Sequence, residues 1–121
     1  MSWTADQLDL IGRSDELEIL TRRWTPIWAV TTAGQVYVRT WHARDTGWYG
    51  HAVRTGRARI RVPGLETDVT VAATTERRAE IDGAYRDKYA RYGTGAVGPM
   101  VADAAAASTL LLSPAGAAGA R

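Results

Sequence analysis

The 121-residue chain contains no cysteine, which excludes disulfide bonds and thiolate ligands for metals. Its two histidines, His42 and His51, lack the spacing of metal ligands, so we expect no metal site. The longest strongly apolar runs, residues 27–30 and 110–112, are far shorter than the roughly 20 residues of a membrane-spanning helix. The N-terminus also lacks the basic and apolar segments of a secretion signal. We therefore expect a cytoplasmic protein without a membrane partner.

Phenylalanine is absent as well, so the aromatic residues are five tryptophans and five tyrosines. Their rings combine a dry face with a hydrogen-bonding edge, which suits a pocket for a flat, conjugated ligand. Alternatively, they simply fill a small barrel and its rim. Several of them gather with an arginine within 21 residues: Trp28, Tyr37, Arg39, Trp41 and Trp48. This grouping favours a small-molecule pocket.

Charge is unevenly distributed, although the net charge is only +2. Residues 1–21 carry a net −4, residues 22–61 a net +7 and residues 62–121 a net −1. The central block suits a ligand with phosphates or carboxylates, unless its arginines only reflect a GC-rich genome. Three arginines on one face of a predicted strand, Arg57, Arg59 and Arg61, suggest contact with nucleic acid. The small net charge argues against that contact, so no nucleic-acid partner is expected.

The pattern of apolar residues and turn signals predicts an α+β domain over residues 1–114. In this domain, about six antiparallel strands form a split β-barrel with covering helices. Residues 115–121 are expected to form a flexible C-terminal tail. Strands are predicted at residues 16–23, 27–32, 35–41, 57–62, 68–73 and 108–113, and helices at 4–12, 47–56, 75–92 and 97–107. The two hairpins turn at Ala33-Gly34 and at Pro63-Gly64.

Two segments are ambiguous at this level. The stripe Ile81, Tyr85, Tyr89 and Tyr92 on the long predicted helix either packs against the sheet or forms a dimer face. The segment Gly93–Gly98 has the spacing G-x-G-x-x-G, but it follows a helix rather than a strand, so we interpret it as a loop.

Several short motifs together resemble a small bacterial family of unknown function over nearly the whole chain. They are Thr25-Pro26-Ile27-Trp28, Tyr37-Val38-Arg39, Trp48-Tyr49, Ala84-Tyr85-x-x-Lys88-Tyr89 and Thr109-Leu110-Leu111-Leu112-x-Pro114. That family looks like a relative of the deazaflavin-dependent nitroreductases and, more remotely, of flavin-binding split-barrel proteins. The resemblance implies a split β-barrel, a homodimer and a flavin or deazaflavin in a cleft near the subunit interface. The basic, glycine-rich segment of the nitroreductases is replaced here by residues 21–25, so another planar cofactor or no cofactor also stays open.

Three functions follow as hypotheses. In an oxidoreductase-like enzyme, Arg39 and Arg54 bind the cofactor phosphate, with Arg22 and Arg23 secondary, while Trp28, Tyr37 and Trp48 surround the ring. In a cofactor-free enzyme of small-molecule biosynthesis, such as a cyclase or isomerase, the acid–base groups are His51, Tyr85 and Tyr89, with His42 and Asp82 as further candidates. The third hypothesis is a non-catalytic binding module.

Arg39 carries the sharpest expectation. Strand alternation places Tyr37 and Arg39 on one side, facing either a ligand or a covering helix, and Val36 and Val38 on the other. We expect Arg39→Ala to leave the fold intact and to weaken ligand binding by about 1.5–3 kcal/mol.

Overall fold

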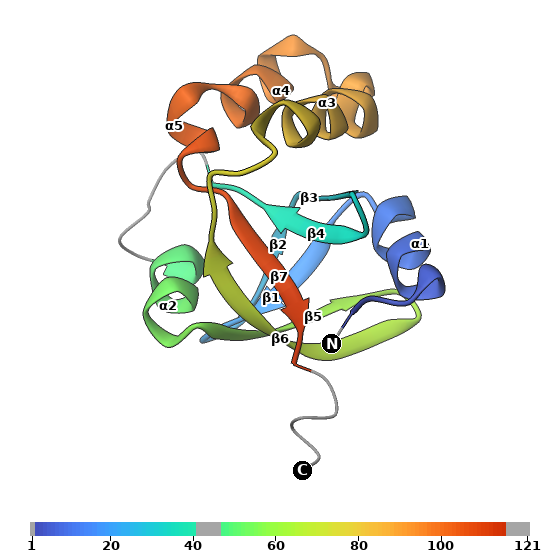
Figure 1. The fold of residues 1–121 in the computed structure, drawn as a ribbon, viewed down its shortest axis with the longest axis vertical. Helices are drawn as coiled ribbons and strands as arrows, with labels where there is room; N and C mark the ends of the chain where they lie inside the picture. The colour runs from blue at the N-terminus through green and yellow to red at the C-terminus, as the bar shows by residue number, and fades with distance from the viewer. Residues whose placement is uncertain (1, 41–46, 116–121) are drawn as a thin grey trace.

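Seven antiparallel strands form one sheet that curls into a nearly closed barrel, with helices around it (Figure 1). The computed structural model describes residues 2–40 and 47–115. The strands are β1 (Leu17–Leu20), β2 (Trp24–Ile27), β3 (Ala29–Thr32), β4 (Gln35–Val38), β5 (Arg57–Val62), β6 (Leu65–Ala73) and β7 (Leu110–Pro114). The helices are α1 (Ala5–Arg13), α2 (Gly47–Thr55), α3 (Arg78–Tyr89), the 3₁₀ turn η1 (Ala90–Tyr92), α4 (Thr94–Val101) and α5 (Asp103–Ala106). The α+β fold class and the split-barrel architecture are therefore confirmed.

Both predicted hairpins are present. Strands β3 and β4 pair with Thr32 opposite Gln35, and the turn residues Ala33 and Gly34 both have positive φ, as a type I′ turn requires. Strands β5 and β6 turn at Pro63-Gly64, where φ of Gly64 is 90°. Local turn chemistry thus sets the register of these four strands.

The sheet has one strand more than the about six expected, because residues 24–27, which the predicted strands 16–23 and 27–32 do not cover except at Ile27, form a separate strand before Trp28. The segment before Trp28 is β2, which pairs with β1 at one edge of the sheet, and the segment after it is β3 at the opposite edge. Pro26 has no N–H to donate and is therefore tolerated on an edge strand. A single residue, Trp28, joins the two edges of the barrel.

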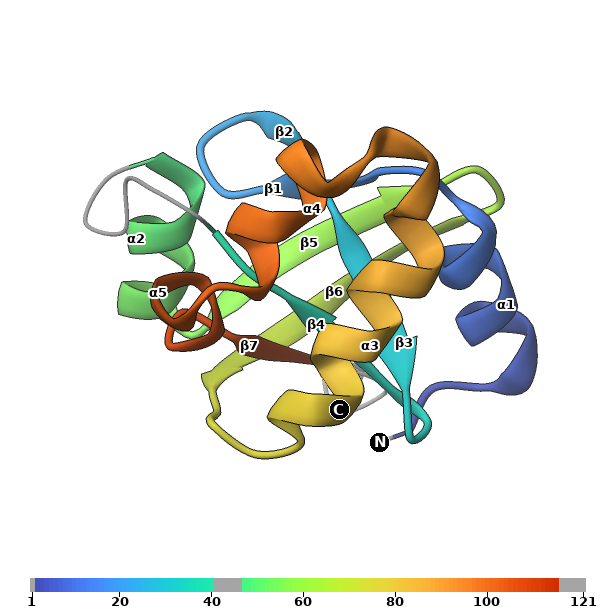
Figure 2. The ribbon, with the colours of Figure 1, turned by 90° about the horizontal axis from the view of Figure 1, so that it is seen from above.

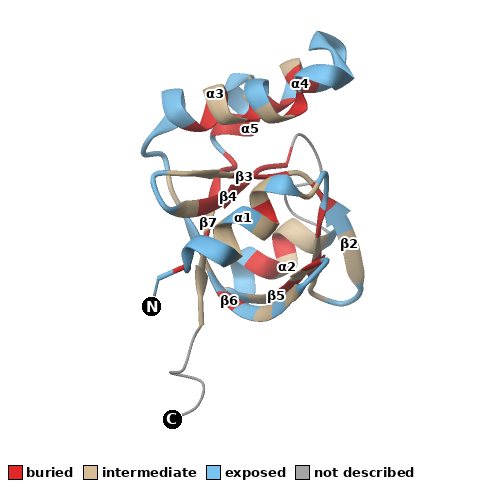
Figure 3. Ribbon diagram, turned by 90° about the vertical axis from the view of Figure 1, so that its right-hand side faces the viewer, coloured by how far each residue is buried: buried red, intermediate tan, exposed pale blue. Residues whose placement is uncertain are grey.

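Two apolar clusters lie on opposite faces of the sheet. The first fills the barrel and includes Ile19, Val36, Val38, Ile60 and Leu112. The second lies between the sheet and helix α3 and includes Val30, Tyr37, Ile81 and Tyr85. Burial therefore runs along the sheet-facing side of α3 to α5 as well as through the barrel (Figure 3).

Helices α3 to α5 form a layer above β3 and β4 (Figures 1 and 2). Tyr85 and Tyr89 are completely buried beneath α3, so the core interpretation of the tyrosine stripe is confirmed and the dimer-face interpretation is wrong for these two residues. Tyr92, by contrast, is 45% exposed. None of the helices in residues 2–40 and 47–115 combines the length and apolar character needed to cross a membrane.

The loop predicted for Gly93–Gly98 is wrong. Gly93 has a φ of 83° and ends η1, and helix α4 begins directly at Thr94. The first glycine of this segment, Gly93, separates the two helical segments η1 and α4. Its positive φ is a conformation that glycine adopts readily and that residues with a side chain avoid. The tail residues 116–121, as well as Trp41 and His42, lie outside the described part of the chain.

Two side chains of α3 hold the chain in place at the Trp28 corner through hydrogen bonds to the backbone. The Tyr89 hydroxyl accepts from the Ala29 N–H at 3.1 Å and donates to the Asp15 carbonyl at 2.8 Å. The Lys88 Nζ donates to the carbonyls of Ala29 at 2.6 Å and Ile11 at 3.2 Å. Backbone groups that have no sheet partner at the corner are thus hydrogen-bonded by the covering helix.

Burial at this corner makes stability depend on pH. Burial lowers the pKa of Lys88 to about 8 in the folded protein, against about 10.4 in an unfolded chain. Between these values the unfolded state binds more protons, so stability rises with pH there. We expect wild-type stability to rise by roughly 1–2 kcal/mol from pH 8 towards pH 10, a gain limited by solvent screening, and Lys88→Met to lack this rise.

Urea denaturation across pH 7–10 measures the effect. Above about pH 10 the raised pKa of buried Tyr85 and Tyr89 acts in the opposite direction, because unfolded tyrosines lose their protons first. Parallel pH profiles for wild type and Lys88→Met would contradict the role of Lys88.

Candidate functional site

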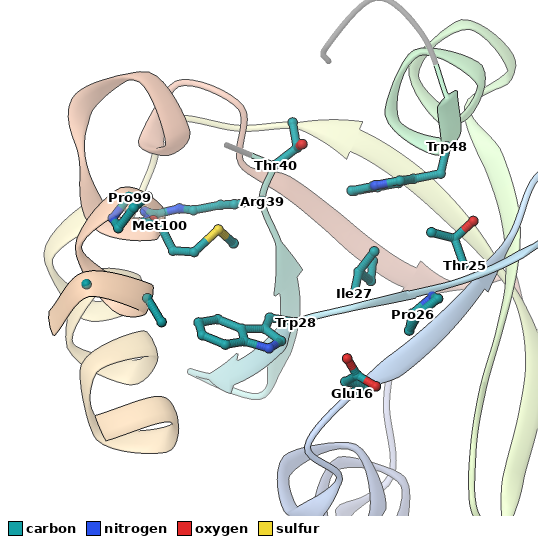
Figure 4. A pocket seen from close by; sticks show the side chains of 12 residues that line it. Glu16, Thr25, Pro26, Ile27, Trp28, Arg39, Thr40, Trp48, Pro99 and Met100 are labelled. Atoms are coloured by element: carbon teal, nitrogen blue, oxygen red, sulfur yellow. The ribbon is translucent and has the colours of Figure 1, made fainter. Parts of the chain in front are cut away.

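A cleft of about 720 Å³ opens where the Trp28 corner meets helices α2 and α4 (Figure 4). Its twelve described lining residues are Glu16, Thr25, Pro26, Ile27, Trp28, Arg39, Thr40, Trp48, Gly95, Ala96, Pro99 and Met100. Five separate segments of the chain meet here, because the barrel edges, the end of β4 and two helices converge on one side. The volume lies within the range of pockets that bind small organic molecules.

Trp28 provides a fixed aromatic surface at the cleft. Its indole stacks on Tyr89 with ring centroids 4.0 Å apart and planes 3° apart, and Tyr92 lies 5.5 Å away on a tilted plane. The Tyr89 ring is itself held by the hydrogen bonds of its hydroxyl. Trp28 is therefore supported on one side while it borders the cleft, and Trp48 borders the same cleft from helix α2 (Figure 4).

Arg39 lies in the wall of the cleft, but its guanidinium is engaged with the helical layer. The residue is only 2% exposed, and its Nη1 donates to Asp82 of α3 at 2.6 Å and to the Met100 carbonyl of α4 at 2.9 Å. Its Nε donates to the Thr109 hydroxyl at 2.9 Å. One buried cation thus connects β4 with α3, α4 and the start of β7.

Two polar atoms in this layer, Arg39 Nη2 and the Tyr85 hydroxyl, have no hydrogen-bond partner among the described residues. The Arg39 guanidinium lies 5.4 Å from the centre of the Tyr85 ring. Burial raises the pKa of Tyr85, so its hydroxyl keeps its proton at neutral pH. Both atoms are fully buried, so neither reaches a molecule in the cleft in this arrangement.

The structure brings three of the predicted ligand-binding residues, Trp28, Arg39 and Trp48, to one cleft. Tyr37 does not join them, because it is buried under helix α3. Arg54 lies on the exposed surface of α2. The secondary candidates Arg22 and Arg23 are exposed in the turn between β1 and β2.

The predicted acid–base residues do not share this cleft. His51 borders a second hollow of about 630 Å³ between α2 and strands β5 and β6. Tyr85 and Tyr89 are buried beneath α3, and their hydroxyls do not border the first cleft. Asp82 is the partner of Arg39. Within residues 2–40 and 47–115, no group of three His, Asp or Glu residues is placed to hold a metal ion.

Sequence reasoning missed nine of the described lining residues: Glu16, Thr25, Pro26, Ile27, Thr40, Gly95, Ala96, Pro99 and Met100. The glycine-spaced segment was the available signal for Gly95 and Ala96, since glycine and alanine leave room for a ligand beside a helix. Glu16 had no local signal, because only the folding of β1 and β2 places it at the cleft.

Comparison with known proteins identifies one family. A family described as "Uncharacterized protein conserved in bacteria (DUF2255)" matches residues 5–112. No curated protein matches the chain.

The burial of Arg39 corrects the expectation that Arg39→Ala leaves the fold intact. Removing this cation leaves the Asp82 carboxylate, 12% exposed, without its buried partner. We expect Arg39→Ala to cost about 3–5 kcal/mol of unfolding free energy. Arg78→Ala is the matched control: it removes the half-exposed arginine 3.3 Å from the same carboxylate and should cost below about 1 kcal/mol.

A double variant, Arg39→Met with Asp82→Leu, should recover most of the loss, because it removes both buried charges together. Chemical denaturation of the four proteins measures these differences. An Arg39→Ala protein as stable as Arg78→Ala would show that the guanidinium is not a structural anchor.

Proposed function

The chain belongs to this bacterial family, and we propose that it binds a planar organic molecule in the cleft between Trp28 and Trp48. The Trp28 ring, stacked on Tyr89 at 4.0 Å while it lines the cleft, is the observation that carries the proposal. Flat conjugated rings stack favourably on such a surface. A ring that is already held in place loses little conformational freedom on binding.

A flavin or deazaflavin is the specific ligand that the motifs of the sequence favour, and it would make the protein an oxidoreductase. Such a cofactor supplies hydride or electron transfer, while the chain supplies orientation and a dry pocket. The cleft volume and the two indoles fit its ring system. The described lining residues do not fit its phosphate, because Arg39 is the one cation among them and is already paired with Asp82. The proposal therefore rests on the fit of the ligand's ring system to the cleft, and not on recognition of its phosphate.

A cofactor-free cyclase or isomerase has less support. Its candidate groups His51, Tyr85 and Tyr89 lie in different places, and burial raises the pKa of both tyrosines. No observation brings an acid and a base together within reach of one substrate among the described residues. Planar-ligand binding is thus the function that the geometry favours.

Fluorescence titration with riboflavin, flavin mononucleotide and a deazaflavin tests the proposal. We expect the ring to quench tryptophan emission, and riboflavin to bind at least as tightly as its phosphate, because the one described lining cation, Arg39, is already paired with Asp82. Trp28→Leu should weaken binding by roughly five- to thirtyfold, equivalent to about 1–2 kcal/mol of lost stacking. Trp24→Leu is the matched control, since Trp24 packs against Arg61, 4.0 Å from its ring centre, and does not line the cleft.

Two further measurements accompany the titration. Absorbance above the tryptophan band in the purified protein would identify a retained chromophore, and light scattering reports whether the chain forms the homodimer that the resemblance implies. If no planar probe changes either the fluorescence or the melting temperature, the proposal is wrong.

A further inference from the structure

The charge that the described residues present to the cleft is negative. Of the lining residues, only Glu16 and Arg39 carry a formal charge at neutral pH. Glu16 is exposed, and its carboxylate forms no ion pair or side-chain hydrogen bond with the described residues. Arg39 is buried and faces Asp82 at 2.6 Å. Among the residues that the structure describes, the Glu16 carboxylate is therefore the charge that a bound molecule can reach.

Neighbouring charges do not cancel that of Glu16. Asp15, the residue before it, is paired with Arg91 of η1. The cation of Lys88 is directed to the carbonyls of Ile11 and Ala29 and does not line the cleft. Glu18, two residues further along the chain, is paired with Arg61 at 2.8 Å. Glu16 is the acid of this segment that is left without a basic partner among the described residues.

The tryptophans add to this negative field. The face of an indole carries partial negative charge and attracts organic cations, most strongly when solvent is displaced. Trp28 and Trp48 both border the cleft, and Figure 4 shows Glu16 at its edge on the side of Trp28. An anionic ligand would instead meet a carboxylate and two ring faces of the same sign.

We propose that the cleft selects an organic cation: a planar aromatic molecule that carries a fixed positive charge or a protonated amine. The ring lies against Trp28, and its positive charge is placed towards Glu16. This inference rests on the proposed function, because it names the ligand class of the same cleft. It reverses the expectation of a phosphate or carboxylate ligand that the arginine-rich block of the sequence suggested.

Three probes of similar shape separate the two proposals: 1-methylquinolinium as the cation, quinoline as the neutral ring and quinoline-4-carboxylate as the anion. Calorimetry or fluorescence gives their dissociation constants with the full chain at low and high salt. We expect the cation to bind about tenfold more tightly than quinoline and the anion to bind most weakly. Salt should reduce the preference for the cation, because the Glu16 charge is exposed.

The Glu16→Gln variant assigns the preference to one side chain. It should reduce the ratio of cation to neutral affinity by roughly three- to fivefold, the value of an exposed ion pair, and leave quinoline binding unchanged. Glu18→Gln is the matched control, because Glu18 is a paired carboxylate outside the cleft. Its affinity ratio should equal that of wild type.

Each outcome bears on a different statement. Failure of all three probes to bind overturns the proposed function and this inference together. Binding of quinoline without a preference for the cation overturns this inference alone. A preference for the cation that Glu16→Gln leaves at its wild-type value contradicts the assignment to Glu16.

Discussion

The closure of the barrel at Trp28 is the constraint on which the rest of the structure depends. Strands β2 and β3 are the two edges of the sheet, and one residue joins them, so the edges must come together at this point. The chain cannot continue the sheet ladder through such a corner, and its backbone needs other partners. Tyr89 and Lys88 supply them at Ala29. Because Tyr89 also stacks on Trp28, the contact that closes the barrel orients the ring that borders the cleft.

A buried ion pair fixes the second wall of the cleft. Arg39 and Asp82 are held together by one hydrogen bond of 2.6 Å in the layer between the sheet and the helices. Such a pair contributes little net stability compared with an apolar pair, but it specifies how the layers are aligned, because either charge alone would be costly. Arg39 also bonds the Met100 carbonyl, which places α4 above the cleft. The pair is close to neutral as a unit, so its cation contributes little to the field that a ligand meets.

The parts of the fold that could be predicted from sequence are those determined by neighbouring residues. The turns at Ala33-Gly34 and Pro63-Gly64, the strand alternation and the helix that ends just before Gly56 are local patterns, and each is present. Strand β2 (Trp24–Ile27) was missed because Pro26 argues against a strand through residues 24–27. The break at Trp28 was missed because residues 27–32 have the apolar pattern of one continuous strand. The pairing of Arg39 with Asp82 joins residues far apart in the chain, so no local sequence pattern predicts it. Two of the cleft's aromatic residues could be predicted, but its acidic edge could not.

The arginine-rich block shows why charge counted along a chain is a poor guide to charge in a site. Its members are distributed over different surfaces once the strands pair. Arg59 lies between Glu66 and Asp68 of the neighbouring strand, each 2.7 Å away, and Arg61 faces Glu18. Arg39 is buried, and the Asp82 carboxylate compensates its charge. Three arginines of this block thus have carboxylate partners in other elements, whereas Glu16, from the acidic N-terminal segment, stands at the cleft without a described basic partner. The charge at the cleft therefore depends on which side chains the barrel leaves unpaired, and not on the number of charges along the chain.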